Sequence, residues 1–119
     1  MEDLGAEAPA FPTIVAAGER SSLPHARPTD RRIRRGDAVL FDWGARWGGY
    51  NSDLTRVVFS DKIARDFQRQ YRVVLAAQRR ALAQVWPGRK AGSVDAAARS
   101  FLKAHRCGNR FGHGTGHGP

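Results

Sequence analysis

The sequence predicts an α+β fold, because strand-like segments fill its first half and helix-like segments fill its second. Apolar and polar residues alternate over residues 37–59, as they do along half-buried strands. Apolar residues then recur every three or four positions over residues 63–86 and again over 93–103, which is the helical period. A block of strands followed by a block of helices is typical of an antiparallel sheet with separate helices.

The first strand is expected over residues 11–17. A loop is expected over residues 19–30, because Pro24 and Pro28 exclude a helix there. His25 follows the first of these prolines and is therefore presented on a stiff, non-helical backbone. We keep it as a candidate site residue.

The second and third strands are expected to form a hairpin that turns at Gly48-Gly49. Counting back from this turn places Asp42 opposite Thr55, and alternation of side chains puts Asp53 on the same face as Thr55. Diagonal neighbours lie about 7–8 Å apart, so the two carboxylates can converge on one divalent metal ion or on two. One aspartate alone could equally be an edge carboxylate bonded to nearby backbone, whereas two like charges this close need a cation between them.

The first helix is expected over residues 63–86, with Ser60 or Asp61 as its N-cap. Pro87-Gly88 is expected to end it, because proline cannot continue a helix. The residues expected on its apolar face are Ile63, Phe67, Tyr71, Val74, Leu75, Leu82 and Val85.

The second helix is expected over residues 93–103, with Ser93 as its N-cap and Gly108 as its terminator. Its apolar stripe is narrower than that of the first helix, and it consists of Val94, Ala97, Ala98, Phe101 and Leu102.

A glycine at every second position marks residues 112–118. Glycine disfavours a helix, and in an extended chain His113, Thr115 and His117 share one face. Imidazoles suit divalent zinc, manganese, iron or cobalt. The alternative is a flexible glycine-rich tail whose histidines bind nothing.

Composition sets the class of protein. The chain has 119 residues, 41% of them hydrophobic, which suits one domain or part of one. Its formal charge of +9 could attract nucleic acid, but no aromatic residues interleave the arginines. We therefore interpret the arginines as solvated surface and expect no nucleic-acid partner.

Cysteine and apolar content indicate the compartment. Cys107 is the only cysteine, so no internal disulfide can form and a reducing compartment is expected. The N-terminus is acidic and no apolar run is long enough to span a bilayer. The sequence thus predicts a cytoplasmic protein without a membrane partner.

Several motifs, in this order and spacing, resemble the catalytic domain of pita-bread metallopeptidases of the creatinase/aminopeptidase-like type. Within that family they look most like Xaa-Pro dipeptidases and proline aminopeptidases, with a methionine aminopeptidase-type member as an alternative. The segments that carry the resemblance are residues 11–18, 23–25, 36–37, 42–45, 49–50, 52–56 and 112–118.

The resemblance implies a dinuclear metal centre in which Asp42, Asp53 and His117 are ligands. It also implies that His25 and His113 are catalytic residues that contact substrate or stabilise the reacting carbonyl. Two divalent ions are the implied cofactor, with manganese or cobalt expected and zinc or iron as alternatives. The implied partners are a peptide substrate cleaved at an N-terminal Xaa-Pro bond and, in the full-length enzyme, a second copy of the protein.

The sequence departs from the family pattern in its ligand set. The family completes its centre with two glutamates and adds another active-site histidine, and none of these has a match before Pro119. We therefore interpret residues 1–119 as the N-terminal portion of a catalytic domain. The expected structure is a partial pita-bread fold, a curved antiparallel sheet with helices packed on one face and the second half missing, inactive alone. The alternative is a non-catalytic pita-bread-like binding module.

Overall fold

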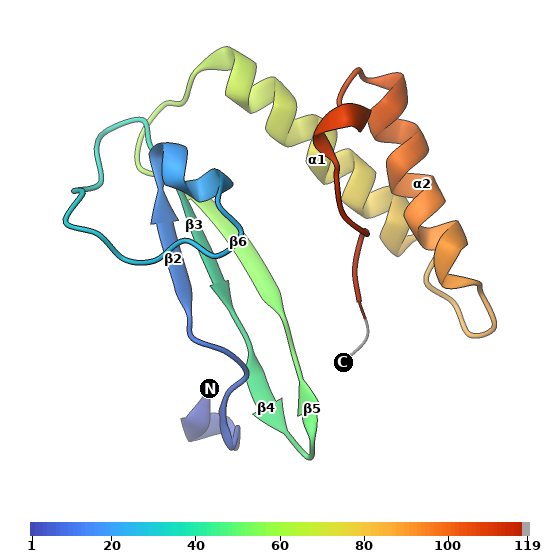
Figure 1. Cartoon of the computed structure of the whole chain (residues 1–119), viewed down its shortest axis with the longest axis horizontal. Coiled ribbons are helices and arrows are strands. Elements are labelled where there is room, and N and C mark those ends of the chain that lie inside the picture. Colours follow the sequence, from blue (N-terminus) through green and yellow to red (C-terminus); the bar gives the residue numbers. More distant parts are fainter. Residues whose placement is uncertain (118–119) are drawn as a thin grey trace. The chain divides into compact units, whose positions relative to one another are not determined.

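The computed structural model describes residues 1–117 and divides into two compact units (Figure 1). Residues 1–64 form the first unit, which holds all the described strands, and residues 65–117 form the second, which is helical. The strands therefore precede both α-helices, as the sequence predicts, and the first unit also begins with a short 3-10 helix, η1 (Glu2–Leu4). No helix among the described residues is long and apolar enough to cross a bilayer.

The first unit contains two three-stranded sheets, ordered β1-β4-β5 and β2-β3-β6, in which every pair is antiparallel. Figure 1 shows β3 continuing into β4 and β5 into β6, as two arms of one long hairpin. The strands are β1 (Ala8–Pro9), β2 (Ile14–Ala17), β3 (Ala38–Trp43), β4 (Ala45–Trp47), β5 (Tyr50–Asn51) and β6 (Leu54–Phe59).

The predicted register of the hairpin is confirmed. Trp47 pairs with Tyr50 across the glycine turn, and Asp42 pairs with Thr55 in the adjoining sheet. Both turn glycines have positive φ, 56° at Gly48 and 82° at Gly49, which is the backbone a tight two-residue hairpin requires.

Gly44 lies where the first arm of the hairpin passes from β3 to β4 and so from one sheet to the other. Its carbonyl accepts a hydrogen bond from Ala10 N at 2.9 Å, and the next residue, Ala45, accepts one from Ser52 N at 2.9 Å. A Cβ atom at Gly44 would overlap the carbonyl oxygen of Ser52 and lie 3.0 Å from Ala10 Cβ. Only glycine lets three backbone segments approach this closely.

The loop after β2 begins with a 3-10 helix, η2 (Gly18–Ser22). The expectation of a purely non-helical loop is therefore wrong for these residues. The prolines do not prevent this turn, because a 3-10 turn is short. It ends at Ser22, before either proline. Residues 23–30 contain no helix, as predicted.

Arg31 and Asp37 close this loop onto the start of β3. The guanidinium donates to both carboxylate oxygens, at 2.8 and 3.0 Å, and Arg34 N donates to Oδ2 at 2.8 Å. The Arg31 guanidinium and the Arg34 N–H hold the pKa of Asp37 at about 2, below its ordinary value of 3.8.

Acidification is expected to destabilise the first unit through this pair. Because the folded pKa of Asp37 is lowered, its contribution to stability is present above the unfolded pKa and is lost as the pH falls from about 4 to about 2. Urea unfolding followed by circular dichroism at several pH values measures the loss. Asp37→Asn should be less stable than the wild type at pH 6 and show a shallower decline below pH 4. Parallel declines would contradict the assignment.

The second unit packs two helices, α1 (Arg65–Leu82) and α2 (Ala91–Ala104), followed by a 3-10 helix, η3 (Gly108–Arg110). Small residues of both helices meet at its centre and permit close approach of the helices. The buried residues are Ala77, Ala81, Ala98 and Leu102, and the residues packed around them are Val73, Val94, Phe101, Cys107 and Phe111.

The predicted apolar face of α1 is only partly shielded, since Tyr71 and Leu75 are half-buried. Alanines form the buried side, whereas Phe67, Val74 and Leu82 are 42%, 57% and 62% exposed. The predicted stripe of α2 is confirmed at its centre, where Ala98 and Leu102 are buried. Periodicity places apolar residues on helix faces but does not decide which face meets the neighbouring helix.

The predicted N-cap of the first helix is also wrong, since α1 begins at Arg65. Both candidate caps bond the loop before β3 instead. Ser60 Oγ donates to Arg34 O at 2.7 Å, and the Asp61 carboxylate accepts from Arg35 Nε at 2.7 Å. Tertiary contacts therefore occupy the side chains that a local rule assigns to capping.

The end of α1 comes earlier than predicted, at Leu82 rather than at residue 86. Beyond this point Val85 and Trp86 are 61% and 68% exposed. A helix gains most of its stability from packing, and the packed side of α1 ends at Ala81. Pro87-Gly88 therefore lies in the connection rather than at the helix end.

The ends of α2 also differ from the prediction, because the helix covers Ala91–Ala104 rather than residues 93–103. Lys90 is the N-cap, and Ser93 Oγ donates to Lys90 O at 2.7 Å instead of accepting from a backbone N–H. After the helix, Arg106 adopts the left-handed conformation with φ 58°. Gly108 packs against Lys103, where a Cβ would lie 3.0 Å from Cα, so its role is close approach rather than termination.

Candidate metal centre

Asp42 lies on β3 and is half-buried. Its partner across the sheet, Thr55, donates a hydrogen bond from Oγ1 to Asp42 Oδ1 at 2.7 Å. The bond fixes the orientation of the carboxylate and directs one oxygen to Thr55. The second oxygen, Oδ2, has the charge and hardness that a divalent cation prefers.

Asp53 immediately precedes β6 and is exposed. The pairs on either side of it, Arg46 with Asn51 and Trp43 with Leu54, keep one continuous register. Asp53 is thus two residues from Thr55 on the arm opposite Asp42. The two carboxylates belong to the same unit and to facing arms of one hairpin.

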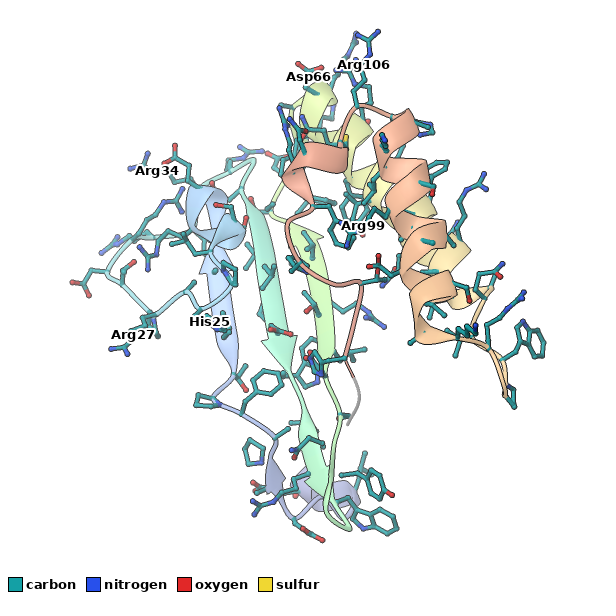
Figure 2. The ribbon with its side chains drawn as sticks, turned by 45° about the vertical axis from the view of Figure 1, so that its right-hand side comes forward. His25, Arg27, Arg34, Asp66, Arg99 and Arg106 are labelled. Carbon is teal, nitrogen blue, oxygen red and sulfur yellow. The ribbon has the colours of Figure 1, made fainter. Side chains whose placement is uncertain are left out.

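His25 lies on the loop between β2 and β3 and is exposed (Figure 2). The loop is tied on both sides of it. Ala26 is only 7% exposed and donates from its backbone to Leu23 O at 3.2 Å, while Arg20 Nη2 donates to Arg27 O at 3.0 Å. The imidazole is therefore carried by an anchored backbone, as the prolines predict.

His113 and His117 lie on the irregular segment after η3, and both are exposed. The prediction that this segment is not helical is confirmed. His113 Nδ1 lies 2.8 Å from Gly114 O, and its ring packs edge-on against Phe111 with centroids 5.0 Å apart. A carbonyl oxygen can only accept, so Nδ1 carries the proton and Nε2 is the nitrogen available to a ligand.

Two residues of α2 that the sequence analysis missed hold this segment. Arg99, labelled in Figure 2, is bonded to Asp95 through two parallel hydrogen bonds and donates to the carbonyls of Phe111 and His113 at 3.0 and 2.8 Å. Asp95 accepts from both the backbone N and Oγ1 of Thr115. The Asp95 and Arg99 spacing of four residues signals a helical ion pair, but nothing local signals the carbonyl contacts.

The predicted ligands, Asp42, Asp53 and His117, have side chains whose chemistry suits divalent cations. Two carboxylates and an imidazole combine hard oxygen with borderline nitrogen ligands. Within residues 1–117, no three side chains of His, Cys, Asp or Glu gather as a complete metal site. Asp42 and Asp53 belong to the first unit and the two glycine-flanked histidines to the second.

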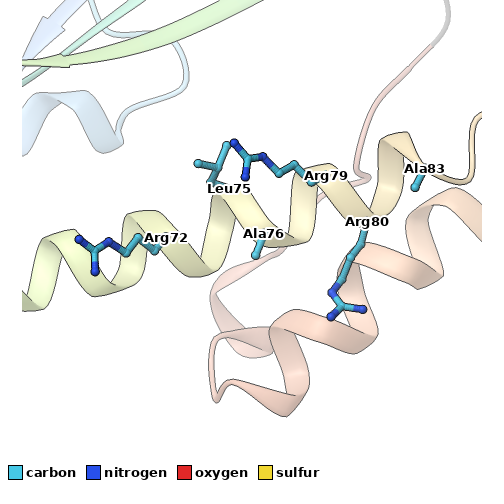
Figure 3. Close-up of a pocket in the computed structure, with 6 residues that line it drawn as sticks. All are labelled: Arg72, Leu75, Ala76, Arg79, Arg80 and Ala83. Carbon is cyan, nitrogen blue, oxygen red and sulfur yellow. The ribbon is translucent and has the colours of Figure 1, made fainter.

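A hollow of about 460 Å³ on α1 contains none of the predicted site residues (Figure 3). Arg79 and Arg80 leave opposite sides of the helix in Figure 3, so their guanidinium groups do not converge on one point. Arg80 instead lies over the Phe101 ring, 4.4 Å from its centroid. The hollow is lined by Arg72, Leu75, Ala76, Arg79, Arg80 and Ala83.

Comparison with known proteins identifies the family. The chain is 45% identical over 118 residues to an Xaa-Pro dipeptidase of Pyrococcus furiosus, an alignment that covers 99% of this chain and 34% of the relative. The crystal structure of a prolidase from Thermococcus sibiricus superposes with a TM-score of 0.89 at 41% identity, covering 97% of this chain and 31% of that one.

An X-Pro aminopeptidase from Thermotoga maritima superposes with a TM-score of 0.81 at 38% identity, covering 91% of this chain and 31% of that one. The strands and helices thus form part of the pita-bread fold of these enzymes, as expected. The chain spans about a third of the length of the curated relatives it matches. The model of metallopeptidase family M24 matches residues 1–119, and the chain belongs to that family.

Proposed function

We propose that this chain supplies part of the active site of a metal-dependent peptidase that cleaves N-terminal Xaa-Pro bonds. The observation that carries the proposal is the register of the hairpin, which sets Asp42 against Thr55 and Asp53 two residues away on the facing arm. The proposed substrate class follows from relatives named Xaa-Pro dipeptidase, to which the chain is 45% and 43% identical. Residues 1–119 are then the N-terminal portion of the catalytic domain.

The proposed ligands are Asp42, Asp53 and His117. When bound, a pair of divalent ions, manganese or cobalt, supplies Lewis-acid polarisation and an activated water for peptide hydrolysis. Thr55 orients the Asp42 carboxylate through its hydroxyl and so limits the reorganisation needed for binding.

His25 and His113 are the proposed substrate-contacting residues. The anchored loop holds His25 in place, and the bond from Nδ1 to Gly114 O leaves Nε2 of His113 as the ring nitrogen available to a substrate. In its cationic form this Nε2 donates a hydrogen bond to the oxygen that gains negative charge as the peptide carbonyl is attacked. In its neutral form, with the proton on Nδ1, Nε2 can only accept a hydrogen bond and therefore cannot stabilise that oxygen.

A chimera tests the proposed function. The matching segment of the Pyrococcus furiosus dipeptidase is replaced by this chain, and hydrolysis of an Xaa-Pro dipeptide is compared with that of the corresponding Xaa-Ala dipeptide in the presence of Mn²⁺ or Co²⁺. We expect hydrolysis with preference for proline. A folded chimera without activity would contradict the proposal.

The 119-residue chain alone is expected to bind Mn²⁺ weakly and to show negligible turnover, because it holds only three of the ligands that the family resemblance implies. Isothermal titration calorimetry and the same peptidase assay measure both quantities. Robust turnover by this chain alone would show that the three ligands suffice.

A further inference from the structure

The side chains of Asp95 and Arg99 form an ion pair on α2. Arg99 Nε donates to Asp95 Oδ2 at 2.8 Å and Nη2 to Oδ1 at 3.0 Å, which is the bidentate geometry that a planar guanidinium favours. The Arg99 guanidinium also lies over the Phe111 ring, 4.6 Å from its centroid. Both side chains are partly shielded, with 41% and 32% exposed for Arg99 and Asp95.

This pair contacts three alternate residues, Phe111, His113 and Thr115, of the histidine segment, which we define as residues 111–117. Arg99 donates to the carbonyls of Phe111 and His113, and Asp95 Oδ1 accepts from Thr115 N at 3.0 Å and Thr115 Oγ1 at 2.9 Å. The next residue in this series is His117, the proposed metal ligand.

The histidine segment needs such anchors because it cannot hold itself in place. It has no regular secondary structure, and a Cβ at Gly112 or Gly116 would meet nothing within 4 Å. Glycine loses more conformational freedom on ordering than any other residue. The position of the segment therefore depends on side chains fixed to a rigid element, and α2 provides them.

We propose that Asp95 and Arg99 are positioning residues that hold the histidine segment on α2 and thereby set where His117 presents its imidazole. The consequence for metal affinity rests on the proposed function, in which His117 is a ligand. The anchoring itself does not. Residues that orient a metal ligand from outside typically change metal affinity by about 10- to 100-fold when replaced.

The test uses Asp95→Asn and Arg99→Lys in the 119-residue chain. Asparagine keeps the shape of the aspartate but loses its charge, and lysine cannot reproduce the forked contacts of the guanidinium. Asp66→Asn is the matched control, because Asp66 and Arg69 form an ion pair on α1 whose side chains are 82% and 75% exposed. Exposed pairs of this kind contribute little.

Hydrogen exchange of the metal-free chain, read residue by residue, measures the anchoring. We expect the Thr115 amide to exchange at least about tenfold faster in both variants, because its acceptor is weakened or displaced. The amide of Leu102, which is 6% exposed, reports opening of the whole unit and should change less. Equal acceleration at both amides, or unchanged exchange at Thr115, would overturn the inference.

Calorimetric titration with Mn²⁺ measures the consequence for the ligand. We expect affinity to fall by about 10- to 100-fold in both variants and to stay unchanged in Asp66→Asn.

Thr115→Val should weaken binding and Thr115→Ser should restore it, because serine keeps the hydroxyl that Asp95 accepts from. Affinity that is indifferent to all these changes would overturn the positioning role. A wild-type chain that binds no Mn²⁺ would count against the proposed function, and the exchange measurement would still decide whether the pair anchors the segment.

Discussion

Asp42→Asn is expected to weaken Mn²⁺ binding by this chain more than about 100-fold, since removal of a ligand should exceed the effect of replacing an outer partner. Asp53→Asn should have an effect of the same order. Both substitutions remove one negative charge and keep the side-chain shape, so the sheet should remain folded. Titration calorimetry measures the affinity, and circular dichroism checks the fold.

Two controls separate ligand loss from a change in net charge. Asp30→Asn removes the same charge from an exposed loop position of the same unit and should leave the affinity unchanged. Thr55→Val removes the hydroxyl that bonds Asp42 and should weaken binding by about 10- to 100-fold, with Thr55→Ser close to wild type. Equal affinities of wild type, Asp42→Asn and Asp53→Asn would refute these ligands.

Gly44→Ala is expected to destabilise the first unit by about 3 kcal/mol, at the upper end of the usual cost of overpacking. The added methyl group would overlap the carbonyl oxygen of Ser52, a backbone atom that cannot rotate away as a side chain can. Relief of the overlap requires movement of the arm that holds the Ser52 N to Ala45 O bond and, next to it, Asp53. Metal affinity should therefore fall together with stability.

Urea unfolding measures this effect as a lower midpoint. Gly92→Ala is the matched control, because its Cβ would meet nothing within 4 Å and its position in α2 favours alanine by up to about 1 kcal/mol. If Gly44→Ala unfolds at the wild-type midpoint, the close packing of the two hairpin arms is not a constraint on the fold.

The hairpin could be predicted from the sequence because its register depends on local chemistry. A two-residue glycine turn fixes which residues face each other, and alternation carries that register back to Asp42 and Thr55. The existence of both helices follows from periodicity in the same way. Their ends do not, because Ser60 and Asp61 bond residues more than twenty positions away and are no longer available as caps.

The sequence by itself therefore determined the order of strands and helices, the pairing of Asp42 with Thr55 and the irregular path of the histidine segment, since each depends on neighbours along the chain or across one tight turn. Only the tertiary structure decided that alanines form the buried side of α1 and that Asp95 and Arg99 hold residues 111–115. The contacts of Asp95 and Arg99 with that segment join positions 12 to 20 residues apart. Neither local propensity nor periodicity contains that information, because it arises only when two elements pack together.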